Sequence, residues 1–185
     1  MRIVGGKHKG RTLGAPKGRD TRPTSDRVRE AMFNILQHGI DGPGLDGAHV
    51  IDVFAGTGAL GLEALSRGAA HATFVEYHRD ALTSLNDNIA TLKEAAHTTV
   101  LACKTAALQA PKNRAVDYAF LDAPYNMGLS EPALDILIAQ GWLTPGCVVL
   151  VEVAALESFC TPQGLSIVKE KSYGAARAVF LIYGP

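Results

Sequence analysis

The sequence predicts an α/β fold whose mostly parallel, seven-stranded sheet ends in an antiparallel hairpin. From residue 49 onward, short apolar runs alternate with stretches in which apolar residues recur at helical spacing. Such alternation indicates strand–helix–strand units and parallel strands. The last two apolar runs, 165–171 and 177–183, are joined without a helix, which favours an antiparallel hairpin at the edge of the sheet.

Residues 1–38 are expected to form a short basic extension in front of the sheet. Its apolar residues predict, in order, two short strands at 2–4 and 11–13 and a helix from a cap at Thr24 or Ser25 to Gln37. The buried face of this helix is expected to carry Val28, Ala31, Met32, Ile35 and Leu36. We therefore divide the chain into an extension at 1–38 and a main domain at 39–185.

Within the main domain, each strand and helix follows from a run of its own. The five strands before the hairpin are predicted at 49–54, 73–77, 98–101, 116–121 and 148–153. Helical spacing is found between them at 59–67, 79–92 and 129–140, with a weaker stretch at 105–109.

Composition indicates one ordinary domain that stays in the cytoplasm. The chain has 185 residues, of which 47% are apolar, and no apolar run reaches the ~20 residues of a membrane helix. Three scattered cysteines neither form a disulfide framework nor match a zinc site, and the six histidines show no ligand spacing. We expect reduced thiols, no metal and a monomer.

The charge is unevenly distributed although the net charge is zero. Residues 1–30 hold nine Lys or Arg against three Asp or Glu, whereas the remainder holds nine against fifteen. A basic segment on an acidic body favours a polyanionic partner met by one end of the molecule. The alternative is a solubilising tail. We expect nucleic acid to contact Lys7, Lys9, Arg11, Arg22, Arg27 and Arg29.

A glycine-rich turn after the first strand of the main domain predicts a ligand site. Gly56, Gly58 and Gly61 fit the G-x-G-x-x-G spacing, and Glu76 ends the second strand twenty residues after Gly56. The same pattern occurs in dinucleotide-binding folds. Asp52 decides between the two, because a carboxylate just before the turn repels a pyrophosphate but attracts an ammonium or a sulfonium.

We therefore expect S-adenosylmethionine as the cofactor. Asp52 and the turn would hold its methionine half, and Glu76 its ribose hydroxyls. The cofactor residues predicted are Asp52, Phe54, Gly56, Thr57, Gly58 and Glu76.

A second loop carries the chemistry. The strand at 116–121 runs into Asp122, Ala123, Pro124 and Tyr125. An exocyclic amine is a poor nucleophile, since its lone pair is delocalised into the ring. The Asp122 carboxylate and the Ala123 carbonyl would stabilise the positive charge that builds on the attacking nitrogen, and Tyr125 would stack on the base. Pro124 favours an extended backbone at Ala123.

These motifs give the chain a resemblance to a known family. The loop Asp122–Tyr125 resembles the amino-methyltransferase signature [DNS]-P-P-[YFW] of the class I methyltransferase Rossmann-like fold. The whole chain resembles the bacterial RsmD-type 16S rRNA guanine-N2 methyltransferases, through Met1–Gly6, Thr21–Leu36, Asp52–Ala69 and Phe74–Glu76. The block from Arg22 to Leu36 is the specific part of this match.

The resemblance implies that the acceptor is N2 of a guanine in 16S rRNA, presented by the 30S subunit or a late assembly intermediate. Two positions depart from the family pattern: Ala123 replaces a proline, and the run 102–106 lacks the aspartate usually found near the adenine. Three alternatives stay open, namely adenine-N6 methylation of DNA, methylation of a protein glutamine, and a non-catalytic RNA-binding assembly factor.

Overall fold

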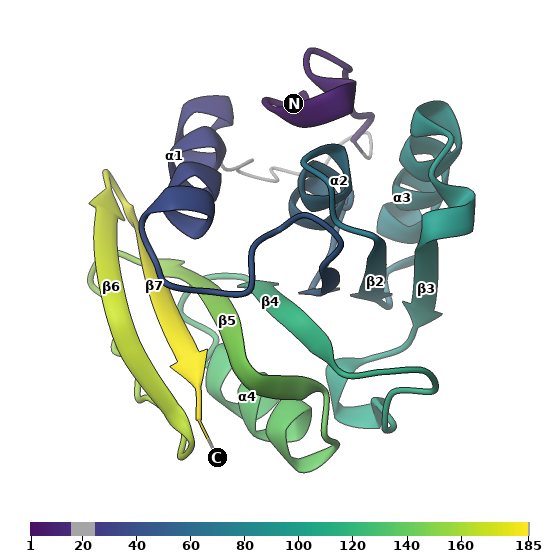
Figure 1. Cartoon of the computed structure of the whole chain (residues 1–185). Coiled ribbons are helices and arrows are strands. Elements are labelled where there is room, and N and C mark those ends of the chain that lie inside the picture. The colour runs from purple at the N-terminus through teal and green to yellow at the C-terminus, as the bar shows by residue number, and fades with distance from the viewer. Residues whose placement is uncertain (16–24, 185) are drawn as a thin grey trace.

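The fold is built on one seven-stranded sheet (Figure 1), and the computed structural model describes residues 1–15 and 25–184 of the chain. The strand order is β3-β2-β1-β4-β5-β7-β6. The strands are β1 His49–Val53, β2 His71–Glu76, β3 Thr98–Ala102, β4 Val116–Asp122, β5 Leu143–Ala154, β6 Leu165–Tyr173 and β7 Ala176–Tyr183. Strands β1 to β5 are parallel, and β7 is antiparallel to both β5 and β6. The predicted fold class is confirmed.

Helices cover both faces of the sheet. In Figure 1, α1, α2 and α3 lie above the sheet and α4 lies below it. The helices are α1 Asp26–His38, α2 Ala59–Ser66, α3 Arg79–Leu92 and α4 Ser130–Ala139, with short 3-10 turns η1 Gly6–His8, η2 Ala95–His97 and η3 Thr105–Ala107. Ser25 caps α1 by accepting the N–H of Val28 at 3.3 Å. Of the two predicted caps, Thr24 lies outside the described residues.

Two apolar cores follow from the alternation of side chains along the strands. Phe74 and Phe120 point to the face that α1 covers with Phe33, and all three belong to one buried cluster. On the other face, Ile51 and Leu134 belong to a second cluster between the sheet and α4. Because both faces are covered, the central strands are apolar along most of their length, as the continuous runs in the sequence indicated.

The N-terminal residues share the first of these cores. Ile3 and Leu13 are buried in the same cluster as Phe33 and Phe74. The two strands predicted here are reduced to a single antiparallel bridge between Arg2 and Thr12, with η1 between them. The segment is too short for a ladder, and its backbone bonds turn back within the loop, as when Gly10 donates to the Ile3 carbonyl at 2.9 Å.

Two further elements differ from the expectation. The weak helical stretch at 105–109 is only the 3-10 turn η3, and the fifth strand begins at Leu143 instead of 148. The buried face of α1 is also displaced around the helix: Arg29, Met32, Phe33 and Leu36 are buried, whereas Val28 and Ile35 are only half-buried. Arg29, which was predicted to contact nucleic acid, therefore lies on the packed face of the helix.

The order of strands places the site. Strands β1 and β4 are neighbours at the centre of the sheet, and the chain proceeds outward from them in opposite directions, through β2 and β3 on one side and β5 on the other. Ligands in such sheets bind beyond the carboxyl ends of the strands at this reversal.

Candidate active site

A cavity of about 590 Å³ lies at the carboxyl ends of β1, β2 and β4. Its volume is within the range of small-molecule sites, which is about 300–1,000 Å³. Every predicted cofactor residue except Gly58 lines this cavity, namely Asp52, Phe54, Gly56, Thr57 and Glu76. The four residues of the chemistry loop line it too, namely Asp122, Ala123, Pro124 and Tyr125. Two loops that are seventy residues apart in the sequence therefore face one space.

An acidic side chain ends each of four neighbouring strands on the same face of the sheet. Asp52, Glu76, Asp122 and Glu152 each follow, by two positions, a residue buried in the core beneath α1 to α3. Since side chains alternate along a strand, all four carboxyl groups point to that face. We call them the acidic row. Asp52, Glu76 and Glu152 are buried, with exposed fractions of 2%, 7% and 4%, and Asp122 is partly buried.

The glycine turn brings backbone close to the cavity. Gly56 and Gly58 have φ of 55° and 81°, and Phe54 has the left-handed φ of 64°. Gly58 is the N-cap of α2, and a Cβ there would lie 2.4 Å from Leu85 Cδ1. Gly58 therefore shapes the turn from behind, which explains why it does not line the cavity itself.

Glu76 holds this turn from the end of β2. Its carboxylate accepts the backbone N–H of Gly56 at 2.9 Å, of Tyr77 at 2.7 Å and of His78 at 2.8 Å. Oε1 accepts the two N–H groups of Tyr77 and His78, and Oε2 accepts that of Gly56, so Oε2 retains acceptor capacity toward a ligand hydroxyl. The spacing between Gly56 and Glu76 is thus a direct contact between the turn and the second strand.

The side chain of Asp52 reaches from β1 to the first turn of α2. Its carboxylate accepts the N–H of Gly61 at 2.8 Å. Burial raises the pKa of Asp52 to about 8; the N–H of Gly61 opposes this rise, and the nearby Glu76 carboxylate adds to it. A buried carboxyl with a raised pKa is stabilised in its charged form when a cation binds beside it.

The chemistry loop adds a second perturbed carboxyl group. The pKa of Asp122 lies well above its ordinary value because the group is buried, and because the Glu152 and Asp52 carboxylates are close to it. Tyr125 donates its hydroxyl to Glu152. The loop then leaves the site through Asn126, which has a left-handed φ of 57°.

Sequence reasoning missed several residues of this site. The sequence pattern places Glu152 in the interior of an apolar strand, although its phase with Leu150 marks it as a strand-end acid like the other three. The cavity wall on the side of β2 and β3 is formed by Tyr77, His78, Cys103 and Thr105, none of which was predicted. Tyr77 is 48% exposed, and the Lys104 ammonium lies 5.5 Å from the centre of its ring.

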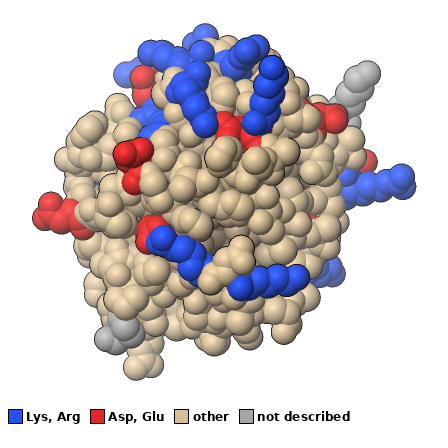
Figure 2. All heavy atoms as spheres, turned by 45° about the vertical axis from the view of Figure 1, so that its right-hand side comes forward, with Lys and Arg blue, Asp and Glu red and all other residues tan. Residues whose placement is uncertain are grey.

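The residues predicted to bind nucleic acid fall into three groups. Lys9, Arg11 and Arg27 are exposed, and Lys7 is exposed with its ammonium 2.7 Å from Glu94. Figure 2 shows Lys and Arg gathered at the top of the molecule, where Figure 1 places the N-terminal segment. Arg22 lies outside the described residues. Arg29 is the exception.

Arg29 is fully buried and lines the cavity instead of the basic surface. It donates to the Arg2 carbonyl and, at 3.0 Å, to Asp26. Its Nε is 3.8 Å from Glu63, a carboxylate with no exposed surface. The reason for this placement is its position on α1, one turn from Met32 and Phe33 on the packed face. Arg29 is not a surface contact for RNA.

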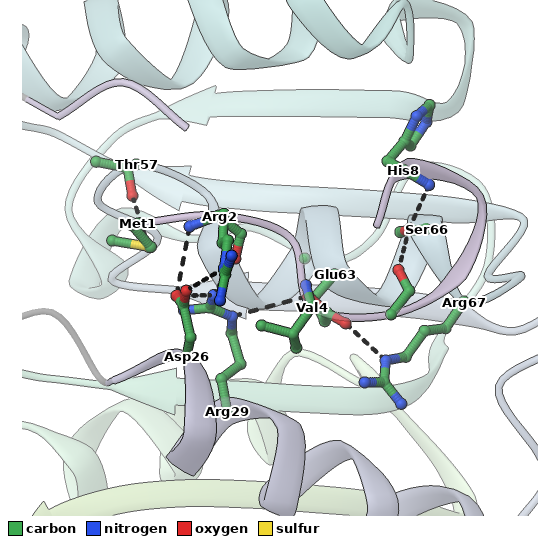
Figure 3. A network of polar contacts seen from close by, with 12 residues as sticks. Met1, Arg2, Val4, His8, Asp26, Arg29, Thr57, Glu63, Ser66 and Arg67 are labelled. Carbon is green, nitrogen blue, oxygen red and sulfur yellow. Dashed lines mark hydrogen bonds and ion pairs between the residues drawn. The ribbon is translucent and has the colours of Figure 1, made fainter. Parts of the chain in front are cut away.

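Arg29 belongs to a polar network that docks the N-terminal segment (Figure 3). Glu63 accepts the N–H of Val4 at 2.8 Å and the Nε of Arg67 at 2.7 Å. Ser66 accepts the N–H of His8 at 2.9 Å and donates to the Gly5 carbonyl. The segment is therefore held against α1 and α2, and Met1 reaches the cavity wall beside Thr57.

Residues 1–15 and 25–184 contain neither a metal centre nor a membrane helix. No group of three or more His, Cys, Asp or Glu in these two ranges is arranged to hold a metal ion. No helix of that part of the chain has the length and apolar character needed to cross a membrane.

Comparison with known proteins identifies relatives of the whole chain. The family model described as Conserved hypothetical protein 95 matches residues 1–182. The chain is 39% identical over 175 residues to Ribosomal RNA small subunit methyltransferase D of Escherichia coli strain K12, covering 94% of this chain and 85% of that protein.

Solved structures agree. A protein described as putative methyltransferase yhhF from Escherichia coli matches with a TM-score of 0.84 and 36% identity, over 100% of this chain and 98% of that one. An RNA methyltransferase from Salinibacter ruber, solved in complex with S-adenosyl-L-homocysteine, matches with a TM-score of 0.65 over 88% of this chain and 94% of that one. At 14% identity, the second likeness shows the fold alone.

Proposed function

This chain belongs to the family described as Conserved hypothetical protein 95, that of the RsmD-type methyltransferases, and we propose that it transfers a methyl group from S-adenosylmethionine to the exocyclic N2 of a guanine in 16S rRNA. The observation that carries this proposal is the common cavity. The turn that suits a cationic cofactor and the loop that suits an amine acceptor line the same space, with Asp52 and Asp122 in one row.

The residues present fit this cofactor. S-adenosylmethionine supplies an electrophilic methyl group on a sulfonium, together with an ammonium and a ribose. Asp52 is buried with a raised pKa, so a bound cation would stabilise its charged form. Oε2 of Glu76 keeps acceptor capacity for a ribose hydroxyl, and the glycine turn lets backbone approach the ligand. Tyr77, Cys103 and Thr105 would border the adenine on the side of β3.

Asp122 and its neighbours would prepare the acceptor amine. The Asp122 carboxylate and the Ala123 carbonyl accept the N–H groups of the amine, which directs its lone pair toward the methyl group. The same two acceptors stabilise the positive charge on nitrogen as the new bond forms. Tyr125 stacks on the base, an interaction worth about 1–3 kcal/mol in nucleic-acid complexes. Ala123, in place of the family proline, keeps the carbonyl and frees one backbone angle.

The basic surface would hold the RNA while the base turns into the cavity. Lys9, Arg11 and Arg27 are exposed, and the network around Glu63 fixes the N-terminal segment next to the cavity wall. Contacts to phosphates position the RNA, and the flipped base is read in the pocket. The name of the E. coli relative points to small-subunit rRNA as the substrate, so we propose the 30S subunit or a late assembly intermediate.

The test is transfer of labelled methyl groups from S-adenosylmethionine to undermethylated 30S particles. We expect label in the RNase-sensitive fraction, on guanine N2 when the modified base is mapped, and none with Asp122→Ala. Label that is lost to DNase or to protease instead would support the DNA or glutamine alternative. If the protein binds the cofactor but transfers no label, the proposed acceptor is wrong. If it does not bind the cofactor, only the hypothesis of a non-catalytic assembly factor remains.

A further inference from the structure

Glu152 is a buried acid that the proposed chemistry does not use. It lies near the end of β5, is 4% exposed, and is absent from the cavity wall. Two residues of the chemistry loop reach it from the neighbouring strand. Tyr125 donates its phenol hydroxyl to Glu152, and Asp122 is its partner in the parallel register of β4 and β5.

The register makes the second relationship close. Directly paired residues on adjacent strands point to the same face, and the strands are about 4.8 Å apart. Leu150 and Phe120, two positions earlier on β5 and β4, are also paired and lie in the core beneath α1 to α3. Asp122 and Glu152 therefore lie side by side above that core, and Tyr125 of the following loop contacts Glu152 through its hydroxyl.

The titratable groups that neighbour Asp122 on the sheet are all carboxyl groups. Glu152 of β5 is paired directly with Asp122, whereas Asp52 of β1 is paired with Phe120 and so lies diagonal to Asp122. Glu76 lies on β2, on the far side of β1. Arg29 of α1, His78 and Cys103 line the same cavity, and Tyr125 belongs to the loop of Asp122 itself. Burial and the Glu152 carboxylate are the two largest causes that raise the pKa of Asp122.

We propose that Glu152 is the positioning residue of the acceptor site: it anchors the Tyr125 ring through its hydroxyl and governs the charge of Asp122 from behind the cavity wall. The inference rests on the proposed function for its consequence in catalysis. Its physical content, a coupling of Glu152 to Asp122 and to Tyr125, is a property of the protein without cofactor or RNA.

Two substitutions separate the two halves of this role. Glu152→Gln keeps an oxygen that can accept the Tyr125 hydroxyl but removes the negative charge next to Asp122. Tyr125→Phe keeps the charge and the ring but removes the anchor. Glu157→Gln is the matched control, since Glu157 follows β5, accepts the N–H of Ala154 at 3.0 Å, and is not part of the cavity wall.

The first experiment titrates the Asp122 carboxyl carbon by NMR in cofactor-free protein labelled with ¹³C-aspartate, with Asp122→Asn to assign the signal. Removing the neighbouring negative charge should lower the pKa of Asp122 in Glu152→Gln and leave it in place in Glu157→Gln. An Asp122 signal that titrates alike in the wild type and Glu152→Gln overturns the charge half of the proposal, whether or not the wild type methylates RNA.

The second experiment is kinetic. If Asp122 acts in its charged form, the acid limb of kcat against pH should move to lower pH in Glu152→Gln by the amount that NMR finds. Tyr125→Phe should lower kcat at least about fivefold, leave cofactor affinity within twofold of the wild type by calorimetry, and keep the acid limb in place. Wild-type kcat in Tyr125→Phe overturns the anchor half. A wild type with no transfer rejects the proposed function alone, because the NMR result stands without it.

Discussion

Gly56 donates its backbone N–H to the Glu76 carboxylate at 2.9 Å, so the turn after β1 is held from the end of β2. The other oxygen of Glu76 accepts two more backbone N–H groups, those of Tyr77 and His78. An amide cannot replace this carboxylate, because its NH₂ group would face a backbone donor whichever way it turned. The proposed cofactor binding and the shape of the turn would therefore depend on the same side chain.

Glu76→Gln should weaken cofactor binding by at least tenfold and lower the free energy of unfolding by about 1–3 kcal/mol, the cost of an unpaired buried donor. Calorimetry and urea denaturation measure the two effects. Glu157→Gln is the control, since the Glu157 carboxylate accepts one N–H and an amide oxygen can replace it. Wild-type affinity in Glu76→Gln would contradict the assignment of Glu76.

Cofactor affinity should increase as the pH rises from 6 to 8. The pKa of Asp52 is raised to about 8, so the empty site holds a protonated Asp52 at lower pH. A bound ammonium or sulfonium favours the charged form, and the proton must leave. The dissociation constant should fall by up to about tenfold per pH unit in this window.

Calorimetry in two buffers of different ionisation enthalpy would detect the released proton. Asp52→Asn should bind weakly and lose the pH dependence, while its amide oxygen still accepts the N–H of Gly61. A wild-type affinity that is flat from pH 6 to 8 would show that Asp52 does not face the cationic part of the cofactor.

Gly58→Ala should destabilise the protein more than Gly44→Ala, although both glycines have φ of 81°. An added Cβ at Gly58 would lie 2.4 Å from Leu85 Cδ1, whereas nothing lies within 4 Å of the same atom at Gly44. The left-handed backbone costs each variant about 1–2 kcal/mol. Overpacking adds about 1–3 kcal/mol to Gly58→Ala alone. Equal midpoints in urea denaturation would contradict the contact between the turn and α3.

Glu63→Ala should lower the free energy of unfolding by about 3–5 kcal/mol, because it leaves the buried Arg29 and Arg67 without their shared carboxylate. Glu170→Ala serves as the control. Glu170 contacts Arg177 at 3.1 Å with a 43% exposed side chain, so its loss should cost less than about 1 kcal/mol. Similar losses in both variants would show that the network does not dock the N-terminal segment.

Reversing two charges at the N-terminal segment, with Lys9→Glu and Arg11→Glu together, should weaken binding to 16S rRNA and leave cofactor affinity unchanged. The slope of log K against log salt should become shallower by about 1 for each phosphate that the variant no longer binds. Lys169→Glu with Lys171→Glu makes the same charge change on the exposed edge strand β6. An equal effect from that pair would mean that only net charge matters.

The fold was predictable because its strands are apolar runs and its helices carry apolar residues at helical spacing, so each element is specified locally. The site was predictable where an acid follows a strand and precedes a glycine turn, as Asp52 does, or a proline, as Asp122 does. Glu152 was not predicted as a site residue, because its place beside Asp122 depends on β5 pairing with β4, which no local sequence pattern shows. The burial of Arg29 was not predicted, because it depends on a partner far along the chain, Glu63.

Methyl transfer turns a sulfonium into a neutral thioether, and the acidic row gives this change a consequence for turnover. In the proposed complex, the carboxyl groups of Asp52, Glu76 and Asp122 line the cavity around a ligand that loses one positive charge at the moment of reaction. The electrostatic attraction between these carboxyl groups and the ligand becomes weaker when the sulfonium loses its charge. This change favours release of the product. The demethylated product should therefore dissociate faster than the donor, and the difference should shrink as the pH falls far enough to protonate Asp52 in the complex.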